Sequence, residues 1–231
     1  MLASLAAVEL ELRDVTAVLV THAHTDHIGG AERIRSAYGT WVLMHEQQVP
    51  HARREFLHQV SVGQVLAMPG ARESCRHVHA IRSGGTAYGP LADPSPSPAP
   101  GALDLPGAPV PVHTLGHTGG HCAYHLPRLG VLVSGDALVT AHPTSRLHGP
   151  QLLPDMFHTD REQALAALSL LEPVDADVIL PGHGPRHREG GPSHTPASGP
   201  RGSPWPVRRT AAGSRRPTNH PQRRRMLRRR H

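Results

Sequence analysis

The sequence predicts an α/β (α+β) fold, in which short apolar strands alternate with helices. Runs rich in β-branched and apolar residues recur along the chain and have the length of strands. They cover residues 15–20, 110–112, 130–133 and 177–180. An amphipathic helical pattern lies between the last two runs, at 160–171. Strands that end in polar loops and are separated by such a helix indicate a domain of packed layers.

A loop with three histidines and an aspartate follows the first predicted strand. It contains His22, His24, Asp26 and His27. Alternate side chains of an extended segment face the same way, so His22 and His24 can bind one ion. Asp26 and His27 lie where the chain turns toward a helix and can reach a second ion. Imidazole nitrogens with a carboxylate oxygen are typical ligands of zinc. The alternative is a solvated histidine-rich loop.

The segments around this loop have simpler patterns. Residues 1–8 suit a short amphipathic helix, 30–37 predict the helix after the loop, and 41–44 predict the next strand. His45 ends that strand, and we expect a structural or substrate-pocket role for it. Four histidines of the ambiguous region 50–82 match no ligand pattern and are expected on the surface or on helices: His51, His58, His77 and His79.

The middle of the chain is rich in proline, glycine, serine and alanine. Residues 83–109 include alternating prolines from Pro94 to Pro100. This composition favours an exposed loop, partly polyproline II and partly disordered, that cannot form a packed core. The loop is either a tolerated surface insertion or a flap beside the functional site.

The second half of the chain carries three more polar loops, each after an apolar run. Gly-His-Thr-Gly-Gly-His covers 116–121, Ser-Gly-Asp covers 134–136, and Pro-Gly-His-Gly covers 181–184. A Thr-x-x-Glu capping box from Thr159 to Glu162 opens the helix that precedes the last strand. The histidines and the aspartate of these loops are therefore candidates to join the first cluster.

Together the four loops resemble the signature of the metallo-β-lactamase superfamily. The loop from His22 to His27 resembles its H-x-H-x-D-H motif, and the other three loops follow in the family's order. The resemblance implies a four-layer αββα sandwich with a two-metal hydrolytic site. Family members have several strands before this motif, so we expect the first strands to be missing from this chain.

The resemblance also implies which side chains bind the metals. The implied ligands are His22, His24 and His117 for one metal, Asp26, His27 and His183 for the other, and Asp136 as the bridge between them. Asp26 and Asp136 would be the catalytic residues, with Asp26 placed to orient the nucleophile or pass a proton. The expected cofactors are two Zn²⁺ per chain, with Fe or Mn as alternatives. His121 is expected to support the ligands without binding a metal.

By the same resemblance, the protein is expected to be a metal-dependent hydrolase. A dinuclear zinc-bound hydroxide would attack a small ester, thioester or lactone. His27 makes a second site without a thiolate, which favours the hydroxyacylglutathione hydrolase and lactonase type branch. Residues 141–156 resemble the family's substrate-pocket loop. Two alternatives stay open: a nuclease or phosphodiesterase of the same superfamily, and an inactive truncated fragment with a polyanion-binding tail.

Charge divides the chain into two unequal parts. Residues 1–185 hold 11 Arg against 17 Asp and Glu, a net charge of −6, whereas residues 186–231 hold 13 Arg against one Glu, a net charge of +12. We therefore expect a metallo-β-lactamase-like domain at 1–186, incomplete at its N-terminus, and an Arg/Pro-rich disordered tail at 187–231. The tail could bind nucleic acid or another polyanion. Its lack of apolar periodicity favours a disordered extension instead.

The remaining composition bears on the cellular setting. Cys75 and Cys122 are too few for a disulfide framework, and Cys122 is expected in the core. The sequence has no basic signal-peptide region at its start and no apolar run near the roughly 18 residues of a membrane helix. We expect a cytoplasmic protein with a small-molecule substrate and no membrane partner. The oligomeric state stays open.

Overall fold

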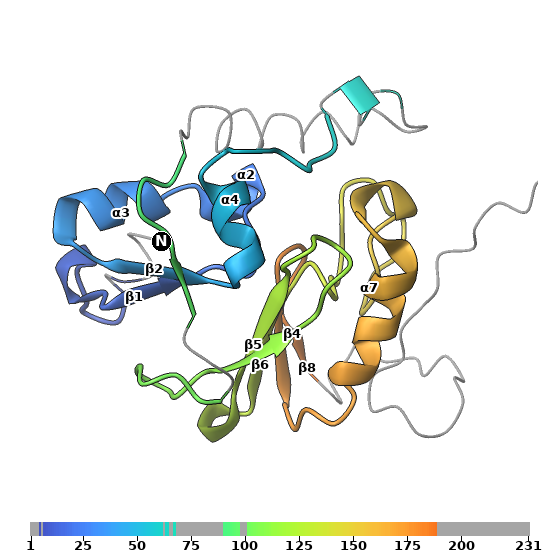
Figure 1. The fold of residues 1–231 in the computed structure, drawn as a ribbon. Helices are drawn as coiled ribbons and strands as arrows, with labels where there is room; N and C mark the ends of the chain where they lie inside the picture. The colour runs from blue at the N-terminus through green and yellow to red at the C-terminus, as the bar shows by residue number, and fades with distance from the viewer. Residues whose placement is uncertain are drawn as a thin grey trace, which may run out of the picture.

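A computed structural model of the protein describes residues 5, 7–61, 63–64, 67, 90–97 and 101–188. Two β-sheets pack face to face, with helices on their outer sides (Figure 1). The strand order is β1-β2-β3 in the first sheet and β4-β5-β6-β7-β8 in the second. This arrangement is the αββα sandwich that the resemblance implied.

The first sheet is parallel throughout. Its strands are β1 (Ala17–Leu19), β2 (Trp41–Met44) and β3 (Ser95–Pro96). Ala17 pairs with Trp41, and Leu43 pairs with both Leu19 and Ser95. Parallel neighbours need a crossover between them. Helices α2 (Thr25–Ile28) and α3 (Ala31–Tyr38) supply the crossover from β1 to β2, so the predicted strand and helix at 41–44 and 30–37 are confirmed within one residue.

The proline-rich region departs from the expectation of an exposed loop. Its Ser95 and Pro96 form β3, and its Leu91 and Leu103 are only 1% and 4% exposed. The prediction is therefore wrong for these residues. Pro96 fits because β3 is an edge strand, where a missing N–H breaks no inner ladder bond. Residues 83–89 and 98–100 of the predicted loop lie outside the described residues.

The second sheet combines an antiparallel meander with one parallel pair. Its strands are β4 (Val110–His113), β5 (Cys122–Leu126), β6 (Val131–Gly135), β7 (Val178–Pro181) and β8 (His187–Arg188). Strands β4, β5 and β6 are antiparallel, β6 and β7 are parallel, and β8 returns antiparallel to β7. The parallel step is bridged by α7 (Arg161–Ala167) and the 3-10 turn η5 (Leu168–Leu170).

Helix α7 starts with a different cap from the predicted one. The Asp160 side chain accepts a hydrogen bond from the Gln163 amide at 2.9 Å. Thr159 instead donates its hydroxyl to the carbonyl of His117 at 3.1 Å. The capping box predicted from Thr159 to Glu162 is therefore wrong, because the Thr159 hydroxyl holds the neighbouring loop and Asp160 takes over the cap.

Short elements complete the described part. They are η1 (Leu12–Asp14), η2 (Glu46–Gln48), α4 (Val49–Ala52), η3 (Pro127–Leu129) and η4 (Asp155–Phe157). At the C-terminal side, buried His187 pairs with Ile179 in β8. His187 and Arg188, which were assigned to the tail, thus belong to the second sheet. Residues 189–231 of the predicted tail, and residues 1–4 and 6 of the predicted N-terminal helix, lie outside the described residues.

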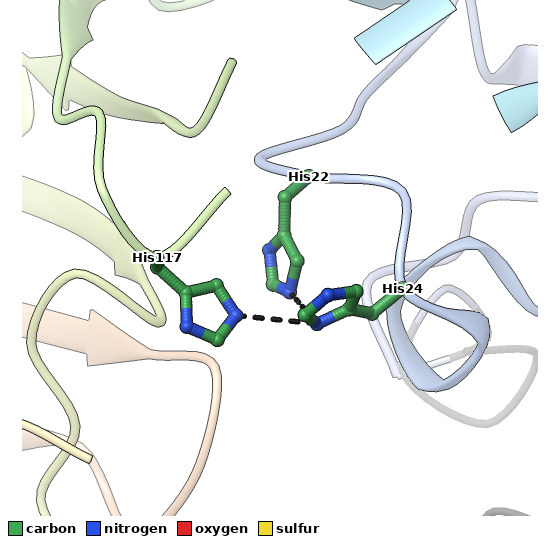
Figure 2. Close-up of side chains that lie close together, drawn as sticks. All are labelled: His22, His24 and His117. Atoms are coloured by element: carbon green, nitrogen blue, oxygen red, sulfur yellow. Dashed lines mark hydrogen bonds between the residues drawn. The ribbon is translucent and has the colours of Figure 1, made fainter. Parts of the chain in front are cut away.

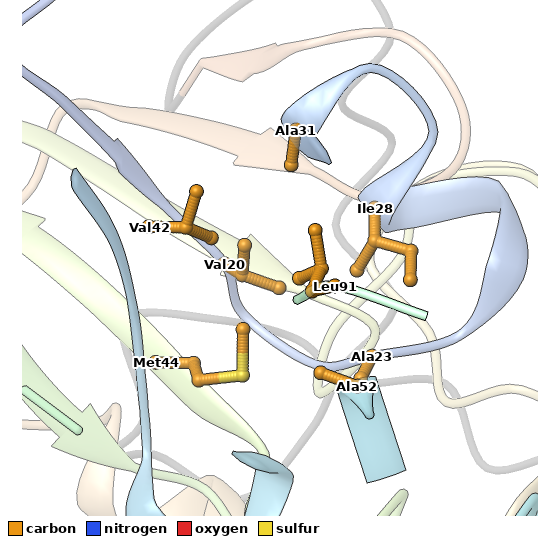
Figure 3. Packing of buried hydrophobic residues seen from close by; sticks show 8 residues of the cluster. All are labelled: Val20, Ala23, Ile28, Ala31, Val42, Met44, Ala52 and Leu91. Carbon is orange, nitrogen blue, oxygen red and sulfur yellow. The ribbon is translucent and has the colours of Figure 1, made fainter. Parts of the chain in front are cut away.

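Three apolar clusters hold the layers together. One joins the first sheet to its helices and includes Val20, Val42, Met44 and Leu91 (Figure 3). A second lies between the second sheet and the α7 side, and the third contains Cys122 and Tyr124 of β5 with Leu19 of β1 packed against them. This third cluster lies between the two sheets, and it confirms Cys122 as a core residue. Among the described residues, no helix is long and apolar enough to cross a bilayer.

Candidate metal centre

Polar loops from both sheets meet where their strands end. The side chains that converge there are His22, His24, Asp26, His27, His117, Asp136 and His183. They follow β1, β4, β6 and β7 or begin α2. The structure thus brings together all seven residues that the sequence singled out as ligands.

Three buried histidines form the first donor group. His22 and His24 come from the loop after β1, and His117 comes from the loop after β4 (Figure 2). His22 Nε2 lies 3.1 Å from His24 Nδ1, and His117 Nε2 lies 3.2 Å from the same atom. Three ring nitrogens therefore point into one small space, as a cation with nitrogen ligands requires.

The His24 ring is oriented by a backbone carbonyl that the sequence did not single out. His24 Nε2 lies 2.8 Å from the carbonyl oxygen of His58. Because a carbonyl can only accept, the hydrogen of the neutral ring sits on Nε2 and leaves the Nδ1 lone pair facing the other two histidines. His58 had been expected on the surface. Its side chain is exposed, and only its backbone takes part.

The second donor group is more open to solvent. Asp26 Oδ2 lies 3.4 Å from His183 Nε2 and 3.8 Å from His27 Nε2, and these two ring nitrogens are 3.4 Å apart. Asp26 and His183 also face the pocket next to the centre. One carboxylate and two imidazoles can hold a cation here and leave a side open to a small molecule.

Asp136 lies between the two groups. Its carboxylate oxygens are 3.4 to 3.9 Å from the Nε2 atoms of four histidines: His22, His27, His117 and His183. The side chain is only 3% exposed, and Oδ1 has no hydrogen-bond partner among the described residues. A buried carboxylate oxygen without a hydrogen bond is costly unless a cation compensates it. The donor set therefore fits the binding of divalent metal.

In the three-histidine group the protonation states agree with this fit, whereas the neighbouring aspartates outweigh burial and raise the pKa of His27 and His183, so these two rings must lose a proton when a metal binds. Burial, followed by the neighbouring histidines, lowers the pKa of His22 well below its ordinary value, and burial also lowers the pKa of His117. Both rings are therefore neutral near pH 7, which is the state that binds a metal. Burial alone would raise the pKa of Asp136, but the nearby His27 and His183 hold that pKa well below its ordinary value. Asp136 is therefore a carboxylate.

The comparison with family models decides the classification. Residues 1–183 match the model described as the metallo-beta-lactamase superfamily. The chain belongs to this superfamily.

Individual relatives of this metallo-β-lactamase superfamily member are distant. The probable metallo-hydrolase YflN of Bacillus subtilis (strain 168) is 27% identical over 180 residues, which cover 73% of this chain and 64% of that protein. The crystal structure of the metallo-beta-lactamase family protein TTHA1429 from Thermus thermophilus aligns with a TM-score of 0.53 and 25% identity, over 80% of this chain and 60% of that one. The chain thus spans less than two thirds of either relative.

A further solved structure supports the fold alone. TTHA1623, crystallised in a di-iron-bound form, aligns with a TM-score of 0.51 and 24% identity, over 81% of this chain and 77% of that one. The αββα architecture is therefore shared with solved members of the superfamily.

Behind the donor groups, His121 supports the loop that carries Asp136. Buried His121 accepts a hydrogen bond from the Asp136 amide through Nε2 at 3.0 Å, and its Nδ1 lies 2.8 Å from the Thr114 hydroxyl. Because a backbone N–H can only donate, Nε2 is the acceptor and the hydrogen of the neutral ring sits on Nδ1. His121 is thus placed to orient Asp136, in the supporting position that the sequence predicted.

A small, partly open pocket lies beside the centre. Five of the seven candidate ligands line it: His24, Asp26, His117, Asp136 and His183. The other described residues that line it are Gln59, Val60, His142, Leu153 and Phe157. Of these, His142 and Leu153 lie in the segment 141–156 that resembled the family's pocket loop, and Phe157 directly follows it. Gln59 and Val60 follow α4 in a segment with no recognisable pattern, so the sequence offered no signal for them. Buried His142 packs its ring against Phe157 and His183.

Other predicted roles for histidines are resolved individually. The His45 ring packs edge-on against His113, with 4.4 Å between ring centroids, and its Nδ1 accepts from the Gln47 amide. Of the two roles expected for His45, structural or substrate-pocket, these contacts fit the structural one. His51 is buried in α4 and stacks on Phe56, so it is a helix histidine. His77 and His79 lie outside the described residues.

Proposed function

We propose that the protein is a metal-dependent hydrolase that uses a two-metal centre on a small ester, thioester or lactone. The observation that carries this proposal is the buried Asp136 carboxylate between two separate groups of metal-binding side chains. Superfamily membership supports the same reaction class. The cytoplasm is the proposed compartment, in keeping with the free thiol of Cys122.

The donor atoms support a division of ligands between two ions. His22, His24 and His117 would hold one ion, and Asp26, His27 and His183 would hold the other, with Asp136 between them. Neutral imidazoles combined with carboxylates suit zinc, and they also suit iron or manganese. Zinc is the proposed metal, and iron is the first alternative because one fold relative is described in a di-iron-bound form.

The chain's own residues can then be given roles in hydrolysis. Two bound cations would lower the pKa of a water molecule and polarise the substrate's carbonyl oxygen. Asp26 borders the pocket as a carboxylate, since the hydrogen bond from His183 and the charge of His27 outweigh its burial and lower its pKa. It can therefore orient an attacking water and accept its proton. His142 borders the same pocket and can contact the substrate.

The pocket wall favours a small acyl substrate over a nucleic acid. Val60, Leu153 and Phe157 give it an apolar side that can bind the hydrocarbon part of a substrate and exclude water. Among the described residues that line it, there is no Arg or Lys to bind a phosphodiester backbone. The hydrolase for small substrates is therefore the proposed function, and a nuclease is not proposed.

Metal content is the test of this proposal. Elemental analysis of purified protein should find about two metal ions per chain. The content should fall sharply in Asp136→Ala and stay unchanged in Asp104→Ala, which alters a carboxylate outside both donor groups. A panel of small thioesters, esters and lactones should then show turnover that Asp136→Ala lacks. Protein that folds but binds no metal would refute the proposal.

A further inference from the structure

A buried amide ties together the two loops of the three-histidine group. Gln48 ends η2, after the first sheet's β2, and is only 2% exposed. Its Oε1 accepts from the Ala23 amide at 2.8 Å, and its Nε2 donates to the Thr118 hydroxyl at 2.8 Å. Ala23 lies between His22 and His24, and Thr118 follows His117. Each bond therefore ends one residue away from a candidate ligand.

The chemistry of these partners fixes which way the amide points. A backbone N–H can only donate, so the oxygen of Gln48 must face Ala23, and its NH₂ group then faces Thr118. Both ends of the amide are used, and both partners are buried. The same hydrogen bonds would be impossible for Leu, Met or another apolar side chain of similar volume. A purely space-filling role would not need this polarity.

The packing around Gly120 is a second, independent observation. A Cβ atom added at Gly120 would lie 2.9 Å from Gln47 Cβ and 3.1 Å from Gln48 Cγ. Real Cβ atoms essentially never approach another atom closer than 3.0 Å. The loop that carries His117 therefore lies directly against η2 and reaches this distance only because residue 120 is glycine.

We propose that Gln48 is a positioning residue that sets the separation between the His22–His24 loop and His117. The inference rests on the proposed metal centre, since it concerns the group that would hold one of its two ions. The two loops belong to different sheets, and near their bases they are joined by the bond from the Cys122 amide to the Thr21 carbonyl, at 2.9 Å. Gln48 joins them beside the imidazoles themselves. Loss of the two Gln48 hydrogen bonds would let the ring nitrogens of His22, His24 and His117 move apart while all three histidines remain.

The test measures metal affinity separately for the two ions. Metal-stripped full-length protein is titrated with Co²⁺ against a chromophoric chelator. Gln48→Leu should weaken one of the two equivalents by about tenfold or more and leave the other unchanged. The matched control is Gln151→Leu, because Gln151 is also a buried amide, with bonds to Ser145 and Gly149, but does not touch these loops.

Thermal unfolding separates positioning from simple stabilisation. Both variants should lower the Tm of the metal-free protein, because each loses buried hydrogen bonds. Only Gln48→Leu should also shrink the rise in Tm that metal produces. Wild-type affinity for both equivalents in Gln48→Leu would overturn the inference. Wild-type protein that binds no metal would instead refute the proposed function, and the inference with it.

A milder change keeps the test decisive if Gln48→Leu does not fold. Thr118→Val removes only the acceptor of the second bond and leaves the bond from the Ala23 amide to Gln48 in place. It should weaken the same single equivalent as Gln48→Leu. Wild-type affinity in Thr118→Val would overturn the inference.

Discussion

A single methyl group added at Gly182 should disrupt half of the metal centre and leave the fold intact. Gly182 directly precedes His183. A Cβ atom there would overlap Asp136 Oδ1 and lie 2.8 Å from His27 Cε1 and 3.1 Å from the carbonyl carbon of Gly135. The backbone of Gly182 has no positive φ. The effect of Gly182→Ala therefore comes from the contacts of the methyl group and not from backbone strain.

The size of the effect follows from what must move. The Asp136 carboxylate must shift by about 1 Å to restore ordinary van der Waals contact. A shift of about 1 Å in a reacting group can cost about 100-fold in activity. Overpacking at such a site costs about 1–3 kcal/mol of the free energy of unfolding. We therefore expect Gly182→Ala to fold, to lose one metal equivalent and to lose about 100-fold in activity.

The assay compares this variant with a glycine change that should be harmless. A Cβ atom at Gly119 meets nothing closer than Gln47 Oε1, at 3.6 Å. Elemental analysis, urea unfolding and turnover are measured for Gly182→Ala beside Gly119→Ala and the wild type. Gly182→Ala protein that keeps two tightly bound metals and full activity would show that Asp136 does not need its observed position.

Three further outcomes are expected. His121→Phe removes the acceptor of the amide that precedes the bridging carboxylate, so it should cost about 1–3 kcal/mol in urea unfolding and about tenfold or more in metal affinity; unchanged affinity would refute its supporting role. Burial alone would lower the pKa of His183, but hydrogen bonds to two aspartates raise it to about 10. This stabilisation is fully present below pH 6.5 and is lost as the pH rises through 10. The free energy of unfolding of the metal-free protein, measured in urea, should therefore fall between these pH values. Asp26→Asn should make that fall smaller. Burial raises the pKa of the Cys122 thiol to about 12; in a Cys75→Ser background, a thiol reagent at about pH 8 should label no cysteine until the protein is unfolded, and rapid labelling of native protein would contradict this.

The residues that the structure brings together could be singled out from the sequence because metal binding restricts residue type and spacing. His22 and His24 must be two positions apart at a strand end to face one ion, and His183 follows an apolar run that can only be a strand here. Strands such as β2 and β7 were recognisable for the same reason, since apolar runs of their length have few alternatives.

Residues that act through their backbone, or through a contact distant in sequence, could not be recognised from residue type or spacing. The His58 carbonyl beside His24 could belong to any residue type, and nothing local distinguishes Gln48 from a solvent-exposed glutamine. The strand β3 contains a proline and only two residues, and its pairing depends on β2 being next to it. Tertiary neighbours decide such features, so composition alone misassigned them.

The wide separation of the ligands in sequence has a consequence for folding. His27 and His183 meet although they are 156 positions apart. A metal held by both closes a loop of that length, and closing it removes conformational freedom from the unfolded chain as a crosslink would. During synthesis, the loop from His22 to His27 emerges long before His183 and can offer only part of a site. Both metals could therefore be bound only after the segments around His27 and His183 have come together. Metal binding would then stabilise a fold that is already formed.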